Sequence, residues 1–200
     1  MFRLILALVL TCLPVKLYAG NILILGDSLS DAYQIPLEKS WPVLLSMRLS
    51  QKHYPYRVIN ESISGQTTAG GLAQIDALML HWRPEIVILE LGANDGLRGL
   101  PISIIRKNLE HLIVKIRGGG SQILLAGMKL PSNLGAGYVR PFGEIFQTLA
   151  DRYDLSFLPF VLKGVHDQPG LMLSDDLHPS VKGQPVILDN IWPVLEPMLD

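Results

Sequence analysis

Apolar runs and helical patterns alternate along this chain from residue 21 to its end. Residues 86–89 and 123–125 are continuously apolar, which is typical of a strand covered on both faces by helices. Between them, Ile105, Leu109 and Ile116 recur at helical spacing. We expect five strands, at residues 21–25, 57–60, 86–91, 122–128 and 155–158. We expect five helices, at residues 41–52, 71–82, 102–117, 142–153 and 181–199.

This order of elements predicts the fold class. Strands that alternate with helices form βαβ units around a parallel sheet, and right-handed crossovers then favour a three-layer α/β/α sandwich. No linker or internal repeat divides residues 20–200, so we expect a single domain. Two stretches, 130–138 and 159–178, are long for connectors, and such loops often belong to binding sites.

Composition narrows the class of protein. Hydrophobic residues make up 48% of the chain and charged residues 18%, which is enough apolar material for a full core. The formal net charge is −1, so no basic surplus indicates nucleic-acid binding.

The first nineteen residues have the layout of a secretory signal peptide. Arg3 precedes an apolar run at residues 4–13, and Ala19 offers a cleavage site before Gly20. We therefore expect a periplasmic or secreted protein with no stable membrane anchor after cleavage. An uncleaved anchor and acylation of Cys12 are the alternatives. Because Cys12 is the only cysteine, cleavage at Ala19 leaves neither a disulfide nor a thiolate nucleophile.

Polar residues follow the strands at the points where each strand ends. The carboxyl ends of parallel strands meet at one edge of a sheet, where open α/β folds bind ligands. Four polar blocks stand there, namely Gly26-Asp27-Ser28-Leu29-Ser30, residues 62–67 around Gly65, Gly92-Ala93-Asn94-Asp95-Gly96, and Asp175-Asp176-Leu177-His178-Pro179.

Together these blocks supply the groups of a serine hydrolase. Ser28 needs a base in order to attack an acyl carbon, and His178 is the candidate base, with Asp175 to orient it. An oxyanion also needs hydrogen-bond donors, and we expect them from Ser28, Gly65 and Asn94. Each block alone has an ordinary structural explanation, such as a helix cap at Ser28 or a turn at Asn94. Their joint presence favours catalysis.

The same four blocks resemble those of the SGNH hydrolases, also called GDSL esterases/lipases. Residues 94–99 and the Lys129-Leu130-Pro131-x-Asn133 motif resemble the branch of periplasmic acyl-CoA thioesterase I, lysophospholipase and arylesterase enzymes. The resemblance implies a flavodoxin-like fold with a five-stranded parallel sheet of order 2-1-3-4-5. It also implies that Ser28, Asp175 and His178 form the triad, and that Ser28, Gly65 and Asn94 form the oxyanion hole.

The predicted substrate is a small acyl ester or thioester, with lysophospholipids among the candidates. We expect Leu97, Pro131 and Asn133 to contact it, and we expect no cofactor and no metal. Carbohydrate acetylesterase activity is the nearest alternative. A metal-dependent phosphoesterase, with Asp27 and Asp95 among its ligands, is a more distant one. The acyl-chain preference, leaving group and oligomeric state stay open.

Overall fold

The computed structural model describes residues 20–199, and the proposed signal peptide lies outside them. Five parallel strands form one sheet in the order β2-β1-β3-β4-β5, which confirms the predicted flavodoxin-like topology. The strands are β1 (Gly20–Gly26), β2 (Tyr56–Asn60), β3 (Ile86–Glu90), β4 (Gln122–Ala126) and β5 (Ser156–Leu158).

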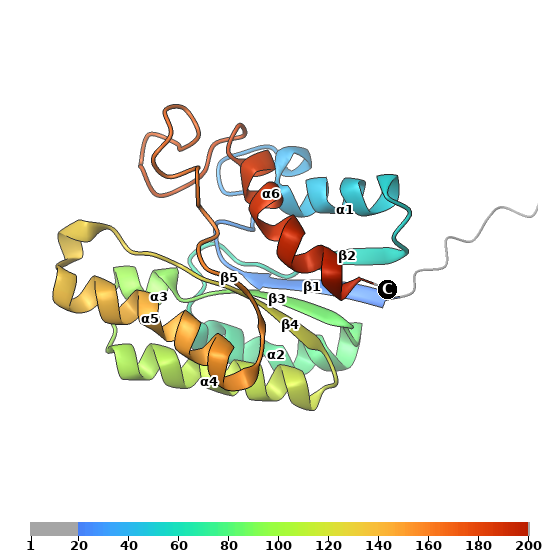
Figure 1. Cartoon of the computed structure of the whole chain (residues 1–200), viewed down its shortest axis with the longest axis horizontal. Coiled ribbons are helices and arrows are strands. Elements are labelled where there is room, and N and C mark those ends of the chain that lie inside the picture. The colour runs from blue at the N-terminus through green and yellow to red at the C-terminus, as the bar shows by residue number, and fades with distance from the viewer. Residues whose placement is uncertain (1–19, 200) are drawn as a thin grey trace, which may run out of the picture.

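Helices cover both faces of this sheet. One layer contains α1 (Trp41–Gln51) and α6 (Gln184–Leu195), and the other contains α2 (Thr68–Trp82), α4 (Ile102–Gly118) and α5 (Ala136–Tyr153) (Figure 1). A one-turn helix, α3 (Ala93–Leu97), follows β3, and the 3₁₀ turns are η1 (Leu37–Lys39), η2 (Ser132–Leu134) and η3 (Glu196–Met198). The predicted three-layer sandwich is confirmed.

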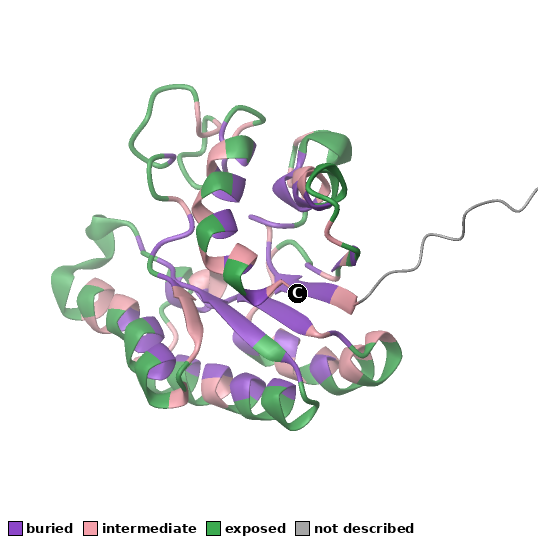
Figure 2. Ribbon diagram, turned by 45° about the vertical axis from the view of Figure 1, so that its right-hand side comes forward, coloured by how far each residue is buried: buried purple, intermediate pink, exposed green. Residues whose placement is uncertain are grey.

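The hydrophobic pattern explains where the core lies. The side chains of Ile22–Leu25 and Ile86–Leu89 are fully buried, because helices pack on both sides of these central strands. The stripe of Ile105, Leu109 and Ile116 on α4 is also buried, as its helical spacing predicted. Figure 2 shows the same arrangement, with buried residues along the strands and on the inward sides of the helices. No helix within residues 20–199 is long and apolar enough to cross a membrane.

Three helices differ in their bounds from the prediction by several residues. Helix α2 begins three residues earlier, at Thr68, because the Thr67 hydroxyl accepts a hydrogen bond from the Gly70 N–H and caps it. Helix α5 begins at Ala136 rather than at residue 142, and it includes Pro141. Helix α6 begins only at Gln184 and ends at Leu195, where η3 continues the chain. Glycine and proline residues in these segments made the helix ends difficult to predict from the sequence.

Candidate active site

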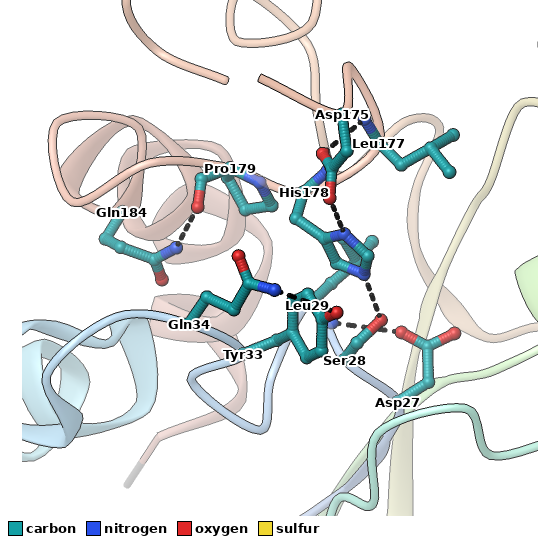
Figure 3. A network of polar contacts seen from close by, with 10 residues as sticks. All are labelled: Asp27, Ser28, Leu29, Tyr33, Gln34, Asp175, Leu177, His178, Pro179 and Gln184. Carbon is teal, nitrogen blue, oxygen red and sulfur yellow. Dashed lines mark hydrogen bonds and ion pairs between the residues drawn. The ribbon is translucent and has the colours of Figure 1, made fainter. Parts of the chain in front are cut away.

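Ser28, His178 and Asp175 form a continuous hydrogen-bonded relay, although 150 residues separate the serine from the histidine (Figure 3). Ser28 Oγ lies 2.9 Å from His178 Nε2, and His178 Nδ1 lies 2.7 Å from Asp175 Oδ2. Ser28 stands in the turn after β1, and the other two residues stand in the long segment between β5 and α6. The structure therefore brings together the three residues that the sequence nominated from opposite ends of the chain.

A tight turn sets the position of the acid relative to the base. Asp175 Oδ1 accepts hydrogen bonds of 3.0 Å from the backbone N–H groups of both Leu177 and His178. Partial burial opposes ionisation of Asp175, but the hydrogen bonds from His178 and Leu177 outweigh it and lower the pKa of Asp175 to about 2. Asp175 is consequently an anion at neutral pH, ready to hold the Nδ1 proton of the imidazole.

Tyr33 is a neighbour of the base that the motifs did not indicate. Its ring stacks on that of His178, with centroids 4.2 Å apart and planes inclined by 33°. Tyr33 belongs to the loop that follows β1, and Figure 3 shows it beside both Ser28 and His178. This contact restricts the imidazole from one side. Because Tyr33 is a single aromatic residue in a loop, no sequence pattern predicts its contact with His178.

The backbone of the serine turn leaves one N–H group free. The N–H groups of Asp27, Leu29, Ser30 and Asp31 each donate to an acceptor in the protein. Within the described residues, the N–H of Ser28 donates to none, and it belongs to the residue whose hydroxyl oxygen contacts His178 Nε2. A free donor at this position is suited to bind an oxyanion formed by attack of that oxygen.

Two further donors match those expected for an oxyanion hole. Asn94, on α3, uses one side-chain N–H to bond Asp27 Oδ2 at 2.9 Å, which leaves the second available. The N–H of Gly65 has no acceptor among the described residues, and the φ angle of this residue is +77°, a conformation that favours glycine. Arg98 donates to the Gly65 carbonyl at 3.1 Å and so holds the loop in place.

Asp95 anchors the end of the loop that carries Gly65. This fully buried carboxylate accepts two hydrogen bonds from Thr68 at the start of α2, one of 2.8 Å from the backbone N–H and one of 2.6 Å from the hydroxyl. Because Thr68 stands only three residues after Gly65, Asp95 connects helix α3, which carries Asn94, to the loop that carries Gly65. Asp95 therefore supports the position of the neighbouring Asn94.

Asp27 supports Asn94 in a comparable way. Its side chain is buried and accepts from the Leu29 N–H at 3.1 Å as well as from Asn94. Burial is the dominant effect on this carboxyl group, and it raises the pKa of Asp27 to about 6 despite these hydrogen bonds. No set of three or more His, Cys, Asp or Glu side chains in residues 20–199 is grouped in a way that could hold a metal ion. Asp27 and Asp95 each accept two hydrogen bonds within the protein.

A pocket of about 180 Å³ opens beside the relay. Leu97 and Pro131, two of the predicted substrate contacts, line it, whereas the third, Asn133, does not and stands exposed on η2. Apart from Ser28 and His178, most of the other lining residues are apolar, namely Leu29, Ala93, Met128, Leu130, Phe160, Leu162 and Leu177. This composition suits an acyl chain.

Asp176 has a strained backbone within the turn that carries Asp175 and His178, and this leads to a stability prediction. Its φ angle is +54°, where a side chain is disfavoured. We expect Asp176→Gly to raise the free energy of unfolding by about 0.5–1 kcal/mol, measured by urea denaturation. Asp151→Gly, placed within α5, is the control and is expected to destabilise by about 1 kcal/mol. Equal destabilisation by both substitutions would show that the Asp176 backbone is not strained.

Comparisons with known proteins agree with this geometry. The model of the GDSL-like lipase/acylhydrolase family matches residues 24–186, a range that includes all four polar blocks. Esterase TesA of Pseudomonas aeruginosa is 41% identical over 192 residues, which cover 96% of each chain. Thioesterase 1/protease 1/lysophospholipase L1 of Escherichia coli K12 is 36% identical over 182 residues, covering 91% of this chain and 86% of that protein.

A solved structure shares the whole fold. The psychrotrophic esterase EstA of a Pseudoalteromonas species, in a form inhibited by monoethylphosphonate, superposes with a TM-score of 0.85 at 35% identity. The similarity covers 89% of this chain and 97% of that one. The described residues therefore share their architecture with an esterase along almost their full length.

Proposed function

This chain belongs to the GDSL-like lipase/acylhydrolase family and is an ester and thioester hydrolase, and we propose that Ser28, His178 and Asp175 are its catalytic triad. The observation that carries this proposal is the relay from Ser28 Oγ through His178 to Asp175, with distances of 2.9 and 2.7 Å. Both contacts lie within the range required of a nucleophile, its base and the group that orients the base.

In the first half of the proposed reaction, His178 Nε2 removes the hydroxyl proton while Ser28 Oγ attacks the carbonyl carbon. Asp175 stabilises the imidazolium that forms. The carbonyl oxygen becomes an oxyanion, and we assign its three donors to the N–H groups of Ser28 and Gly65 and the side-chain amide of Asn94. The tetrahedral intermediate then collapses, and His178 transfers the proton to the departing oxygen or sulfur atom. The acyl group stays bonded to Ser28.

In the second half, water takes the place of the leaving group. His178 removes a proton from the water as its oxygen attacks the acyl carbon, and the same three donors hold the second oxyanion. Collapse of this intermediate breaks the bond to Ser28 Oγ, which regains its proton from His178. The carboxylic acid leaves and the enzyme returns to its starting state, so no cofactor is consumed in the cycle.

The proposed substrates comprise several classes of acyl compound. We assign the apolar pocket to the acyl chain, and lysophospholipids join simple esters and acyl-CoA thioesters as candidate substrates. A panel of p-nitrophenyl esters, acyl-CoA thioesters, lysophospholipids and acetylated sugars, measured with the purified protein, tests this. We expect hydrolysis of the first three classes. Activity on acetylated sugars alone would overturn the assignment in favour of a carbohydrate acetylesterase.

Leu97 offers a direct test of the acyl pocket. This side chain lines the pocket, is 40% exposed and stands at the end of α3, just before glycine at position 99. We expect Leu97→Ala to lower kcat/KM for long acyl chains about tenfold more than for acetyl esters, because only long chains reach the lost side chain. A series of p-nitrophenyl esters measures the difference. An equal loss at every chain length would exclude Leu97 from the acyl site.

We also propose that the protein is exported and that residues 1–19 are removed in the process. The proposal is supported by the charged, apolar and cleavage-site pattern at the start of the sequence. Its consequence is a substrate outside the cytosol, which makes exported or membrane-derived acyl esters better candidates for the physiological substrate than acyl-CoA.

A further inference from the structure

Glu90 is a buried acid directly beneath the serine turn. It is the last residue of β3, and only 1% of it is exposed. In the strand register it stands opposite Gly26, the last residue of β1. A Cβ atom on residue 26 would lie 2.6 Å from Glu90 Oε2, so the glycine leaves the space that this carboxyl group occupies. The lack of a side chain at Gly26 therefore accommodates the Glu90 carboxyl group.

The carboxyl group of Glu90 holds the serine turn at two points. Its Oε2 atom accepts a 3.2 Å hydrogen bond from the Asp27 N–H and a 2.6 Å hydrogen bond from the Ser30 hydroxyl. These two residues flank Ser28 and Leu29, so Glu90 ties down both ends of the segment that carries the nucleophile. The Ser30 carbonyl is held separately, by the side-chain amide of Asn60 at 2.8 Å.

Asp27, which Glu90 holds, also contacts a proposed donor of the oxyanion hole. Asp27, whose backbone Glu90 holds, accepts from the Asn94 side chain and from the Leu29 N–H. A shift of the Asp27 backbone would therefore move the N–H of Ser28 and the amide of Asn94 together. Since a misplacement of about 1 Å in catalytic geometry can cost on the order of 100-fold in rate, the position of this backbone matters for catalysis.

We propose that Glu90 is a positioning residue, which orients the Ser28 N–H and, through Asp27, the Asn94 amide toward the oxyanion. The inference rests on the proposed function, because it assigns Glu90 to the donors of that site. Among the described residues, the hydrogen bonds of the Glu90 carboxyl group go to Asp27 and Ser30 and not to Ser28 or His178, so we assign its effect to those two residues.

The burial of Glu90 changes the acidity of its carboxyl group. Burial raises the pKa of its carboxyl group well above the ordinary value, and the nearby Asp27 carboxylate raises it further. An amide of the same shape can accept the same two hydrogen bonds, and this distinguishes the role from one that needs a negative charge.

Three variants test the proposal. Glu90→Gln keeps an acceptor for Asp27 and Ser30, Glu90→Met removes it at similar volume, and Ser30→Ala removes one of the two contacts. The number of competent sites in each preparation is titrated with a fluorophosphonate, and kcat is expressed per titrated site. We expect Glu90→Met to lower kcat by about 10- to 100-fold with KM little changed. Glu90→Gln should stay close to wild type, and Ser30→Ala should fall between them.

A matched control separates positioning from stability. Leu124→Ala in β4 removes a fully buried side chain away from the serine turn, and it should lower the melting temperature without changing kcat per site. An unchanged kcat per site in Glu90→Met, or an equal loss in Glu90→Gln and Glu90→Met, would overturn the proposal. If Glu90→Met fails to fold, an unchanged kcat per site in Ser30→Ala overturns it. Absence of fluorophosphonate labelling in the wild type would instead contradict the triad itself.

Discussion

Replacing Ser28 with alanine is expected to abolish ester and thioester hydrolysis while leaving the fold intact. The substitution removes the nucleophile from the relay with His178 but retains the backbone N–H of residue 28. Loss of one triad member that acts with the others as a unit lowers kcat by roughly 10⁴- to 10⁶-fold. Steady-state assays with p-nitrophenyl butyrate and an acyl-CoA should show the same loss, because both reactions use one nucleophile.

The matched control for this variant is Ser103→Ala, at an exposed position on α4. It should retain wild-type rates with both substrates. Because Ser28 is half-buried and its alanine replacement is smaller, the melting temperature of Ser28→Ala should also stay near that of wild type. Wild-type rates in Ser28→Ala, with either substrate, would show that another group attacks that carbonyl.

Asn94→Ala should produce the second largest loss, through the oxyanion rather than through the nucleophile. Its side-chain amide has one N–H bound to Asp27 and one free for the substrate. Removing one such donor costs about 100- to 1000-fold in kcat. KM should change little, because the donor acts most strongly on the charge that develops in the transition state.

Gln147→Ala, which removes an amide from the exposed side of α5, is the control for Asn94→Ala. It should leave both kcat and KM unchanged. A rise in KM with unchanged kcat in Asn94→Ala would mean that Asn94 binds the ground state of the substrate, and its assignment to the oxyanion hole would then be wrong.

Much of the fold and of the site could be predicted from four short blocks. A parallel sheet brings the carboxyl ends of its strands to one edge, so Ser28 after β1 and Asn94 after β3 had to be neighbours once the topology was known. The resemblance to the GDSL esterases/lipases is confirmed by the family match, and the predicted strand order is confirmed by the sheet. The structure also brings Ser28, His178 and Asp175 into hydrogen-bonding contact, and their catalytic roles stay a proposal.

The supporting residues were harder to predict, because their roles depend on contacts between segments. Glu90 ended an aliphatic strand, and an acid at the end of a buried run was the one available signal for it. Tyr33 gave no signal, since its stacking on His178 depends on how two loops meet. Asn133 was expected to contact the substrate, and it stands exposed on the 3₁₀ turn η2, outside the pocket lining.

The most direct test of the account is the covalent labelling of Ser28. The purified protein is treated with a fluorophosphonate, residual esterase activity is followed, and the labelled peptide is identified by mass spectrometry. The account predicts one label per chain, located on Ser28, with activity falling in proportion to labelling and no labelling of Ser28→Ala. A fully active protein after complete labelling, or a label on another residue that accompanies inactivation, would contradict the assignment of Ser28 as the nucleophile.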